Sequence, residues 1–267
     1  MNKKNTANYG NWVSNKIIGK TFAAFAFNAA AFTAFIIFAK NAGSIMSTLK
    51  IITIIFSIFF FFALVYFIIA RHIFSYTGGK LQRRVLDEII NRVNWDGRGK
   101  ALDIGCGSGA LTIALAKEYK QAEIIGFDYW GKEWDYCKEL CENNAKIENA
   151  QDNTQFIKGT ASQLPFEDNS INLVVSNMTF HEVKDSKDKL IPISEAIRVL
   201  KKGNSFVLQD LFKLSAYFGT IDELLKAIKA MGVAEAEFVD VSKMDFVPVI
   251  LKLPFMLGAA GIIYGRK

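Results

Sequence analysis

The chain has 267 residues, a formal charge of +6 and a hydrophobic content of 51%. All of the excess charge comes from residues 1–70, which contain six lysines and no other charged residue, whereas the remaining 197 residues contain 26 basic and 26 acidic side chains. The later part has no basic stripe with interleaved aromatic residues, so no nucleic-acid partner is expected. The length allows one large domain, or one medium domain with an appendage.

Two uncharged apolar runs lie near the N-terminus, at residues 21–39 and 51–70. At about 1.5 Å per residue, a helix of either length can cross a hydrocarbon core of roughly 30 Å. A buried core helix or a signal peptide is the alternative, but both runs exceed the ~7–15 apolar residues of a signal peptide. The sequence therefore predicts a membrane hairpin within residues 1–75, followed by a domain at residues 76–267.

Basic residues flank the outer ends of the two runs. Lys16 and Lys20 precede the first run, and Arg71 and Lys80 follow the second. Cytoplasmic flanks are enriched in Lys and Arg. We therefore expect an integral membrane protein with two spans, whose domain and both termini face the cytoplasm.

A glycine-rich turn follows a helical pattern at residues 77–94 and a short apolar run at residues 101–104. Gly105, Gly107 and Gly109 precede a helical pattern at residues 110–120. A strand, a glycine turn and a helix bind a nucleotide-like ligand, because glycine adopts positive φ and lets the backbone approach the ligand. A dinucleotide fits this pattern. However, Asp103 and the glycines also form Asp-x-Gly-x-Gly-x-Gly, which resembles the first motif of class I S-adenosylmethionine-dependent methyltransferases.

A second predicted strand, residues 122–128, ends in an acidic residue. Asp128 lies 23 residues after Gly105. An acid at this place accepts hydrogen bonds from ribose hydroxyls in both ligand classes. The alternative is a cap for a helix predicted at residues 132–145. Tyr129 and Trp130 are placed to cover an adenine ring, or simply to pack.

The segment after a third predicted strand, residues 154–158, makes the resemblance more specific. It reads Gly-Thr-Ala-Ser-Gln-Leu-Pro-Phe and precedes an acidic turn and a fourth strand at residues 171–176. This is similar to the Gly-Asp-Ala-x-x-Leu-Pro-Phe of the methyltransferase family that includes quinone-biosynthesis enzymes. In that family the Asp meets the adenine amino group and the next backbone amide, here at Ala161, meets a ring nitrogen. Thr160 replaces the Asp, and a neutral, shorter hydroxyl predicts weaker cofactor binding.

The fourth strand leads into residues 176–183, Ser-Asn-Met-Thr-Phe-His-Glu-Val. This stretch resembles the fourth motif of the family, which implies that the backbone at Asn177 helps to hold the methionine part of the cofactor. His181 is a candidate general base for a substrate hydroxyl or an acidic carbon. A helix-start residue bonded to backbone is the alternative for His181, and Glu182 is interpreted as structural or solvent-facing.

The remaining elements complete the expected sheet. A helix at residues 186–202, ended by Gly203, precedes a strand at residues 205–209, and Asp210 at its end points into the same cleft. A helix at 220–231, a strand at 235–241 and a strand at 261–265 follow, and the resemblance implies that the last is antiparallel. Residues 246–257 are apolar but broken by two prolines, so they either pack in the core or form a lip at the bilayer surface.

The three cysteines do not indicate a disulfide framework or a metal site. Cys106 lies in the glycine turn, and Cys137 and Cys141 have no further ligand residues at metal-binding spacing. They are interpreted as packing residues, and no metal is expected.

Together these patterns predict an α/β fold, a doubly wound, mostly parallel seven-stranded sheet of the Rossmann-like methyltransferase type behind a transmembrane helical hairpin. The expected function is transfer of a methyl group from S-adenosyl-L-methionine to a small, apolar or membrane-associated acceptor. The alternatives are a nicotinamide-dependent oxidoreductase and a catalytically silent membrane adaptor. His181 is the candidate catalytic residue. The candidate cofactor residues are Asp103, Gly105, Cys106, Gly107, Gly109, Asp128, Tyr129, Thr160, Ala161 and Asn177.

Overall fold

A computed structural model describes residues 6–38, 43–131 and 136–267. The end of the first predicted span, at Ala39, and the start of the helix predicted at 132–145 lie outside these residues. The chain divides into two compact units. One contains residues 11–82, and the other contains residues 1–10 together with 83–267.

The smaller unit is a helical hairpin. Helix α1 runs over Asn15–Phe38 and helix α2 over Ser44–Phe74. Both are long and apolar enough to cross a membrane. The helices contact one another through aromatic side chains such as Phe25 and Phe61, whose ring centroids are 5.8 Å apart.

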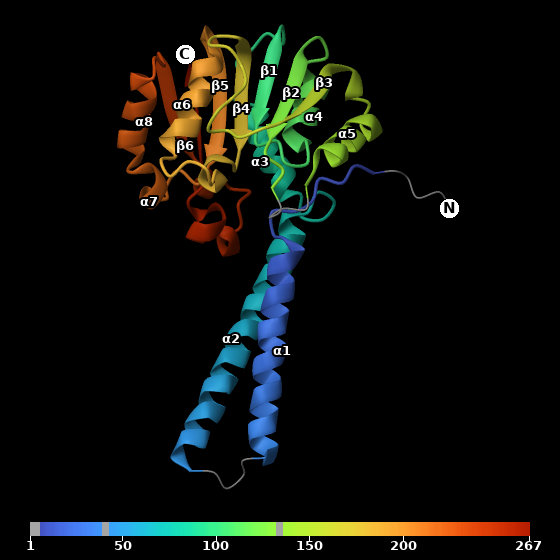
Figure 1. Cartoon of the computed structure of the whole chain (residues 1–267), viewed down its shortest axis with the longest axis vertical. Coiled ribbons are helices and arrows are strands. Elements are labelled where there is room, and N and C mark those ends of the chain that lie inside the picture. The colour runs from blue at the N-terminus through green and yellow to red at the C-terminus, as the bar shows by residue number, and fades with distance from the viewer. Residues whose placement is uncertain (1–5, 39–42, 132–135) are drawn as a thin grey trace, which may run out of the picture. The chain divides into compact units, whose positions relative to one another are not determined.

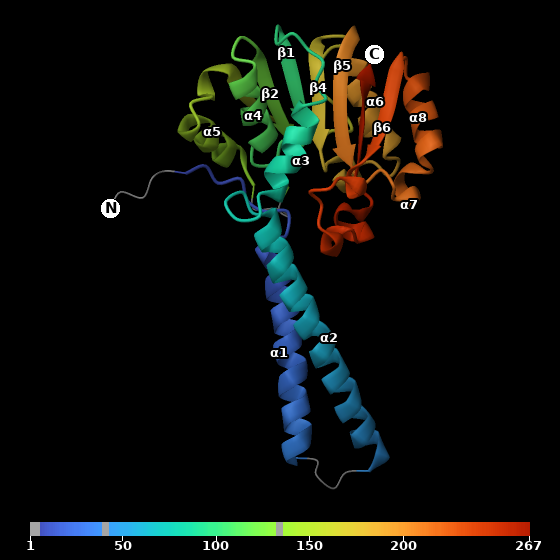
Figure 2. The same ribbon diagram turned by 180° about the vertical axis from the view of Figure 1, so that it is seen from behind.

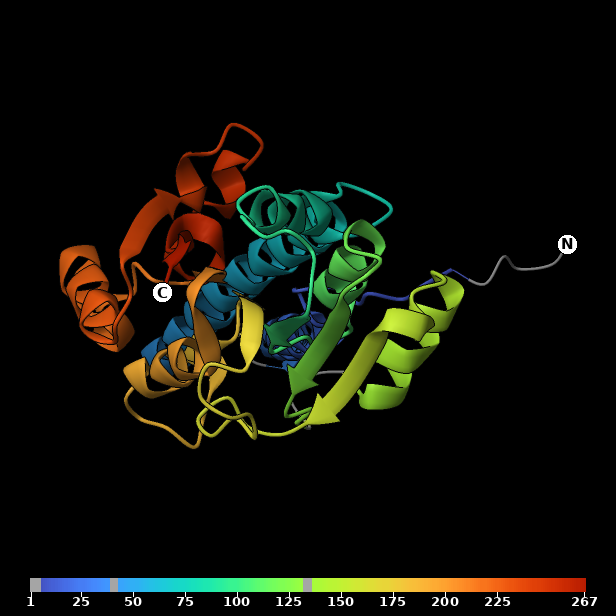
Figure 3. The ribbon, with the colours of Figure 1, turned by 90° about the horizontal axis from the view of Figure 1, so that it is seen from above.

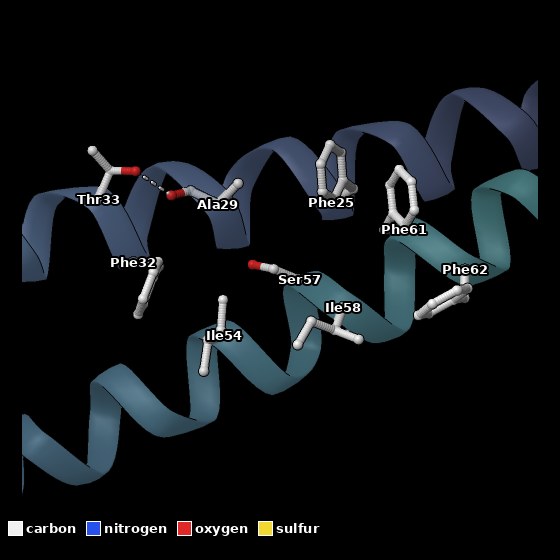
Figure 4. A pocket seen from close by; sticks show the side chains of 9 residues that line it. All are labelled: Phe25, Ala29, Phe32, Thr33, Ile54, Ser57, Ile58, Phe61 and Phe62. Carbon is white, nitrogen blue, oxygen red and sulfur yellow. Dashed lines mark hydrogen bonds between the residues drawn. The ribbon is translucent and has the colours of Figure 1, made fainter.

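A cavity of about 320 Å³ lies between these two helices (Figure 4). Apolar side chains form most of its wall, and only Thr33 and Ser57 bring hydroxyl groups. The hydroxyl of Thr33 donates to the carbonyl of Ala29 at 2.9 Å, and that of Ser57 donates to the carbonyl of Thr53 at 2.8 Å. Both hydroxyls are thus satisfied within their own helix.

The larger unit is built on a mixed sheet with the strand order β3-β2-β1-β4-β5-β7-β6 (Figure 1). The strands are β1 (Lys100–Ile104), β2 (Glu123–Asp128), β3 (Thr154–Lys158), β4 (Ile171–Asn177), β5 (Leu200–Asp210), β6 (Glu235–Asp240) and β7 (Gly261–Arg266). Strands β1 to β5 are parallel, and β7 pairs antiparallel with both β5 and β6. The predicted fold class is confirmed in the described residues, down to the antiparallel last strand.

Helices cover both faces of the sheet. Helix α4 (Ala110–Glu118) lies on one face and α6 (Leu190–Val199) on the other, as the opposite views in Figures 1 and 2 show. Figure 3, seen from above, shows the strands between these two layers. The remaining α-helices are α3 (Leu81–Ile90), α5 (Lys138–Ile147), α7 (Ser215–Phe218) and α8 (Ile221–Ala230). Because both faces are covered, the central strands are continuously apolar; β4, for example, is buried at five of its seven positions.

The helix predicted at residues 186–202 is shorter than expected. It ends at Val199, and Leu200 already pairs with Ile171 as the first residue of β5. Gly203, with φ +75°, therefore lies inside a strand and does not end the helix. The prediction was wrong here because Leu200, Lys201 and Lys202 fit either element by composition, and pairing with β4 decides between them.

The strand order reverses direction between β1 and β4. From β1 the chain moves outward through β2 to β3, then returns across the sheet to β4 on the other side of β1. The carboxyl ends of β1 and β4 thus border the crevice in which open α/β sheets bind ligands.

Candidate active site

The glycine turn between β1 and α4 needs glycine for two reasons. Gly105, Gly107 and Gly109 all have positive φ, at +74°, +55° and +82°. At Gly105 there is also no room, because a Cβ there would lie 1.9 Å from the Oγ1 of Thr179. The turn after β4 therefore packs directly on the glycine turn.

Asp128 is bonded to the glycine turn. Its Oδ2 accepts a hydrogen bond from the backbone N–H of Gly107 at 2.8 Å, and its Oδ1 accepts one from the N–H of Trp130 at 2.6 Å. Burial raises the pKa of Asp128, and these backbone donors oppose the rise. The carboxylate thus stands at the end of β2, beside the turn that follows β1.

Trp130 lies over the same turn. Its backbone has φ +44°, and its indole Nε1 donates to the carbonyl of Gly107 at 2.9 Å. The thiol of Cys141 donates to the same carbonyl at 3.1 Å. Tyr129 points outward, with 67% of its surface exposed. Cys106 is buried, and burial raises the pKa of its thiol well above 9, so it remains a protonated packing residue.

Asp103 is fully buried near the carboxyl end of β1. Its Oδ2 accepts a hydrogen bond from Thr112 at 2.6 Å, while its Oδ1 has no partner among the described residues. Burial raises the pKa of this carboxyl to about 7. A buried acceptor with a raised pKa marks a place where a cationic donor is favoured.

The loop after β4 is fixed by Asp210. The Oδ2 of Asp210 accepts hydrogen bonds from the backbone N–H groups of Thr179 at 3.1 Å and Phe180 at 2.6 Å. Its Oδ1 lies 2.5 Å from the Nδ1 of His181. Because a carboxylate can only accept, Nδ1 donates to it, and in the neutral form of the ring Nε2 carries the lone pair.

The histidine is partly buried, with 14% of its side chain exposed. Burial alone would lower the pKa of His181, but the carboxylates of Asp210 and Glu182 together raise the pKa above 6.5. The Nε2 lies 3.7 Å from Glu182, whose side chain is 44% exposed. His181 is therefore oriented by a buried acid from β5, an arrangement that suits proton transfer.

Asn177 ends β4. The amide oxygen of Asn177 and that of Gln209, opposite it on β5, are buried without a partner among the described residues. The next residue, Met178, has φ +57°, and its N–H donates to the carbonyl of Gln209 at 2.8 Å. The end of β4 thus offers acceptors that protein groups leave unused.

The turn after β3 contains Thr160 and Ala161. Ala161 is 8% exposed and belongs to the core cluster. The hydroxyl of Thr160 does not stand free as an acceptor: it donates to Asp185 at 2.6 Å.

A short N-terminal segment, residues 6–10, also lies at the glycine turn. The side-chain amide of the buried Asn144 accepts from the N–H of Asn8 at 2.8 Å and donates to its carbonyl at 2.8 Å. The same amide donates to the carbonyl of Ser108 at 3.0 Å, and the Ser108 hydroxyl donates to the carbonyl of Tyr9 at 3.0 Å. Asn144 therefore joins three segments of chain that are distant in sequence.

Most of the residues named from the sequence gather at the carboxyl ends of β1 to β4. The sequence placed Asp210 in this region but did not predict its bond to His181. The positions of Trp130 over the turn, Asn144 and Asp185 were also missed. The role of Asp210 could have been inferred from the sequence, since Asp210 is an acid at the end of an apolar strand, as Asp128 is. The roles of Trp130, Asn144 and Asp185 depend on tertiary contacts.

Comparison with known proteins agrees with this geometry. Residues 96–245 match the family model described as a methyltransferase domain. Demethylmenaquinone methyltransferase of Staphylococcus aureus (strain JH9) is 30% identical over 177 residues, which cover 62% of this chain and 69% of the relative. The chain belongs to the methyltransferase-domain family, and it is an S-adenosylmethionine-dependent methyltransferase.

Solved structures show the same fold at low sequence identity. Geranyl diphosphate C-methyltransferase from Streptomyces coelicolor A3(2), bound to S-adenosyl-L-homocysteine, superposes with a TM-score of 0.55 at 14% identity, covering 70% of this chain and 80% of that one. The [4+2]-cyclase SpnF gives 0.52 at 18% identity, covering 69% and 80%. A cyclase among the neighbours shows that this fold alone does not define the reaction.

Proposed function

We propose that this methyltransferase acts on a small apolar acceptor at the cytoplasmic membrane surface. The main support is that one chain contains both a methyltransferase domain and two helices long and apolar enough to span a bilayer. The relative from Staphylococcus aureus is named for a quinone substrate, which supports a quinone-like or lipid-like acceptor. The hairpin anchors the protein as an integral membrane protein, with both termini and the domain in the cytoplasm.

The unused buried groups fit S-adenosyl-L-methionine. The Oδ1 atoms of Asp103 and Asn177 are acceptors for the ammonium group of its methionine part. Asp128 accepts from the ribose hydroxyls, Gly105, Gly107 and Gly109 let the backbone approach the ligand, and Ala161 offers its amide to the adenine. The backbone of Cys106 belongs to the same turn, and Thr160 and Tyr129 flank the site, with Tyr129 on its exposed side.

The bound cofactor supplies an already activated methyl group, so the protein needs mainly to align donor and acceptor and to exclude water. His181 takes the proton from the acceptor at Nε2, and Asp210 holds the imidazole through Nδ1. Asp210 is a positioning residue, because its carboxylate is fully buried and bonded to the loop and the ring.

A surface segment near the C-terminus supports an apolar acceptor. Leu251 and Leu257 are buried, whereas Val249 is 83% and Phe255 62% exposed. Part of residues 246–257 therefore packs in the core, as one interpretation of the sequence expected, and part forms an apolar surface. This surface is the lip through which a membrane-dissolved acceptor enters.

The test is methyl transfer from labelled donor to extracted components of the native membrane. Mass spectrometry should find an organic-phase compound that gains one methylene unit in the presence of the full-length protein and not of the His181→Asn variant. Label confined to water-soluble compounds would exclude a membrane acceptor. Absence of label from both the organic-phase and the water-soluble compounds would favour a catalytically silent adaptor.

A further inference from the structure

A carboxylate from the loop before α6 reaches the turn after β3. The Oδ2 of Asp185 accepts hydrogen bonds from the hydroxyls of Thr160 and Ser162, each at 2.6 Å, and the two hydroxyls are 2.9 Å apart. The partners are separated by 25 and 23 residues in sequence. The three side chains form what we call the Asp185 cluster.

The Asp185 cluster adjoins the end of β2. Strand β3 pairs in parallel with β2, with Lys158 opposite Asp128. The next residue, Gly159, donates its N–H to the carbonyl of Asp128 at 2.9 Å. A base attached to a ribose that is held at Asp128 therefore has the turn of Thr160 and Ser162 as its neighbour.

The bonding pattern leaves the carboxylate able to bind a ligand. All the side-chain hydrogen bonds that Asp185 makes among the described residues use Oδ2. The hydroxyls of Ser162 and Thr160 hold the pKa of this carboxyl below its usual value, so it is ionised at neutral pH. Since the side chain is exposed, its Oδ1 is an acceptor-only group within reach of a ligand.

We propose that Asp185, presented by Thr160 and Ser162, recognises the exocyclic amino group of the adenine of S-adenosylmethionine. This rests on the cofactor site proposed above. Thr160 does not replace a missing carboxylate as a weak acceptor; it donates to a carboxylate that arrives from a different loop. An adenine amino group offers N–H donors to Oδ1, whereas the keto oxygen of a hypoxanthine ring would face a negative charge.

Discrimination between adenine and hypoxanthine ligands distinguishes adenine recognition by Asp185 from a purely structural role, in which Asp185 only fixes the loop (a loop staple). A staple would affect adenine and hypoxanthine ligands equally, since both need the same loop. A recognition group affects the adenine ligand more, because only that ligand loses a charge-assisted bond.

The experiment titrates S-adenosylhomocysteine and its hypoxanthine analogue, S-inosylhomocysteine, into the full-length protein in detergent micelles. The wild type should prefer the adenine ligand at least about tenfold, as expected for a hydrogen bond to a charged group. Asp185→Asn should lose most of this preference, by weakening adenine binding more than hypoxanthine binding. Asp188→Asn, a neutralised acid of the same loop, should behave as the wild type.

A double variant separates the loss of the carboxylate from any loosening of the loop. Thr160→Asp combined with Asp185→Asn returns a carboxylate to the turn from the other side, and should restore the preference for adenine. Equal losses for both ligands in Asp185→Asn, without recovery in the double variant, would show that Asp185 is only a staple. If the wild type binds neither ligand, the proposed cofactor site itself fails, and this inference fails with it.

Discussion

Glycine residues of the same backbone conformation play different parts in this fold. Gly105 and Gly203 have nearly equal φ, +74° and +75°. A Cβ at Gly105 would meet Thr179, whereas a Cβ at Gly203 would meet nothing within 4 Å. The sequence shows both as glycines, and only the structure shows which of them must lack a side chain to allow a close approach.

Alanine substitutions at Gly105 and Gly203 distinguish the cost of a left-handed backbone from the cost of a steric clash. Gly203→Ala should lower the free energy of unfolding by about 1–2 kcal/mol, the cost of a left-handed alanine. Gly105→Ala should cost more, and it should also abolish binding of S-adenosylhomocysteine, because the turn after β4 must move. Thermal unfolding and calorimetry measure the two effects. Equal behaviour of the two variants would contradict the packing described for Gly105.

The His181–Asp210 pair predicts a pH profile. Only neutral His181 can accept a proton, and its pKa is raised above 6.5 by Asp210 and Glu182. The value of kcat/KM should therefore fall as the pH decreases through a pKa higher than 6.5. His181→Asn should reduce kcat by about 10²–10⁴-fold and remove this acid limb, while cofactor affinity stays within about twofold. If the decrease of kcat/KM at low pH persists in the variant, a group other than His181 causes it.

At the scale of elements, local sequence patterns predict the strands and the glycine turn, whereas some element boundaries depend on tertiary contacts. The apolar strands β1 to β4 and the glycine turn follow from sequence because periodicity and φ preference are local. The boundary between α6 and β5 depends on the pairing of Leu200 with Ile171, which a local sequence pattern cannot predict. Helix α8 begins one residue inside its predicted range because Thr220 and Glu223 form a capping box.

The N-terminal segment is another element that the sequence did not place. Residues 6–10 precede the first apolar helix in sequence, yet Asn8 and Tyr9 are bonded at the glycine turn through Asn144 and Ser108. Residues 6–10 thus lie against the glycine turn of the candidate cofactor site.

Asn144→Ala should therefore weaken binding of S-adenosylhomocysteine, by about three- to tenfold if one net hydrogen bond of about 1 kcal/mol is lost from the bound state. Asn153→Ala is the matched control, because the side-chain amide of Asn153 also donates to backbone carbonyls, at Ala116, Tyr119 and Ala122, away from the N-terminal segment. Both variants should lose stability, but only Asn144→Ala should lose affinity. Loss of affinity in both, in proportion to stability, would refute the role of the segment.

At the scale of the whole molecule, charge and hydropathy predicted two helices, and the structure has them at Asn15–Phe38 and Ser44–Phe74. Their orientation in a bilayer remains a prediction from the flanking basic residues. Neither the hairpin nor the sheet identifies the acceptor, because acceptor chemistry depends on side chains brought together from several loops.

Thiol labelling in intact cells tests the orientation. Cys137 is exposed on the domain, and Ser44 begins α2 next to the connecting loop. A membrane-impermeant maleimide should label the Ser44→Cys variant, in a Cys137→Ser background, from outside. It should label Cys137 of the wild type only after permeabilisation. The reverse pattern would place the domain on the outer side.

The most direct test of the account is whether Asp128 and the glycine turn bind the adenosine part of the cofactor. Calorimetry should show one-site binding of S-adenosylhomocysteine to the full-length protein in micelles, no binding of NAD, and at least about tenfold weaker binding by Asp128→Ala. Unchanged affinity in Asp128→Ala, or binding of NAD in place of S-adenosylhomocysteine, would contradict it.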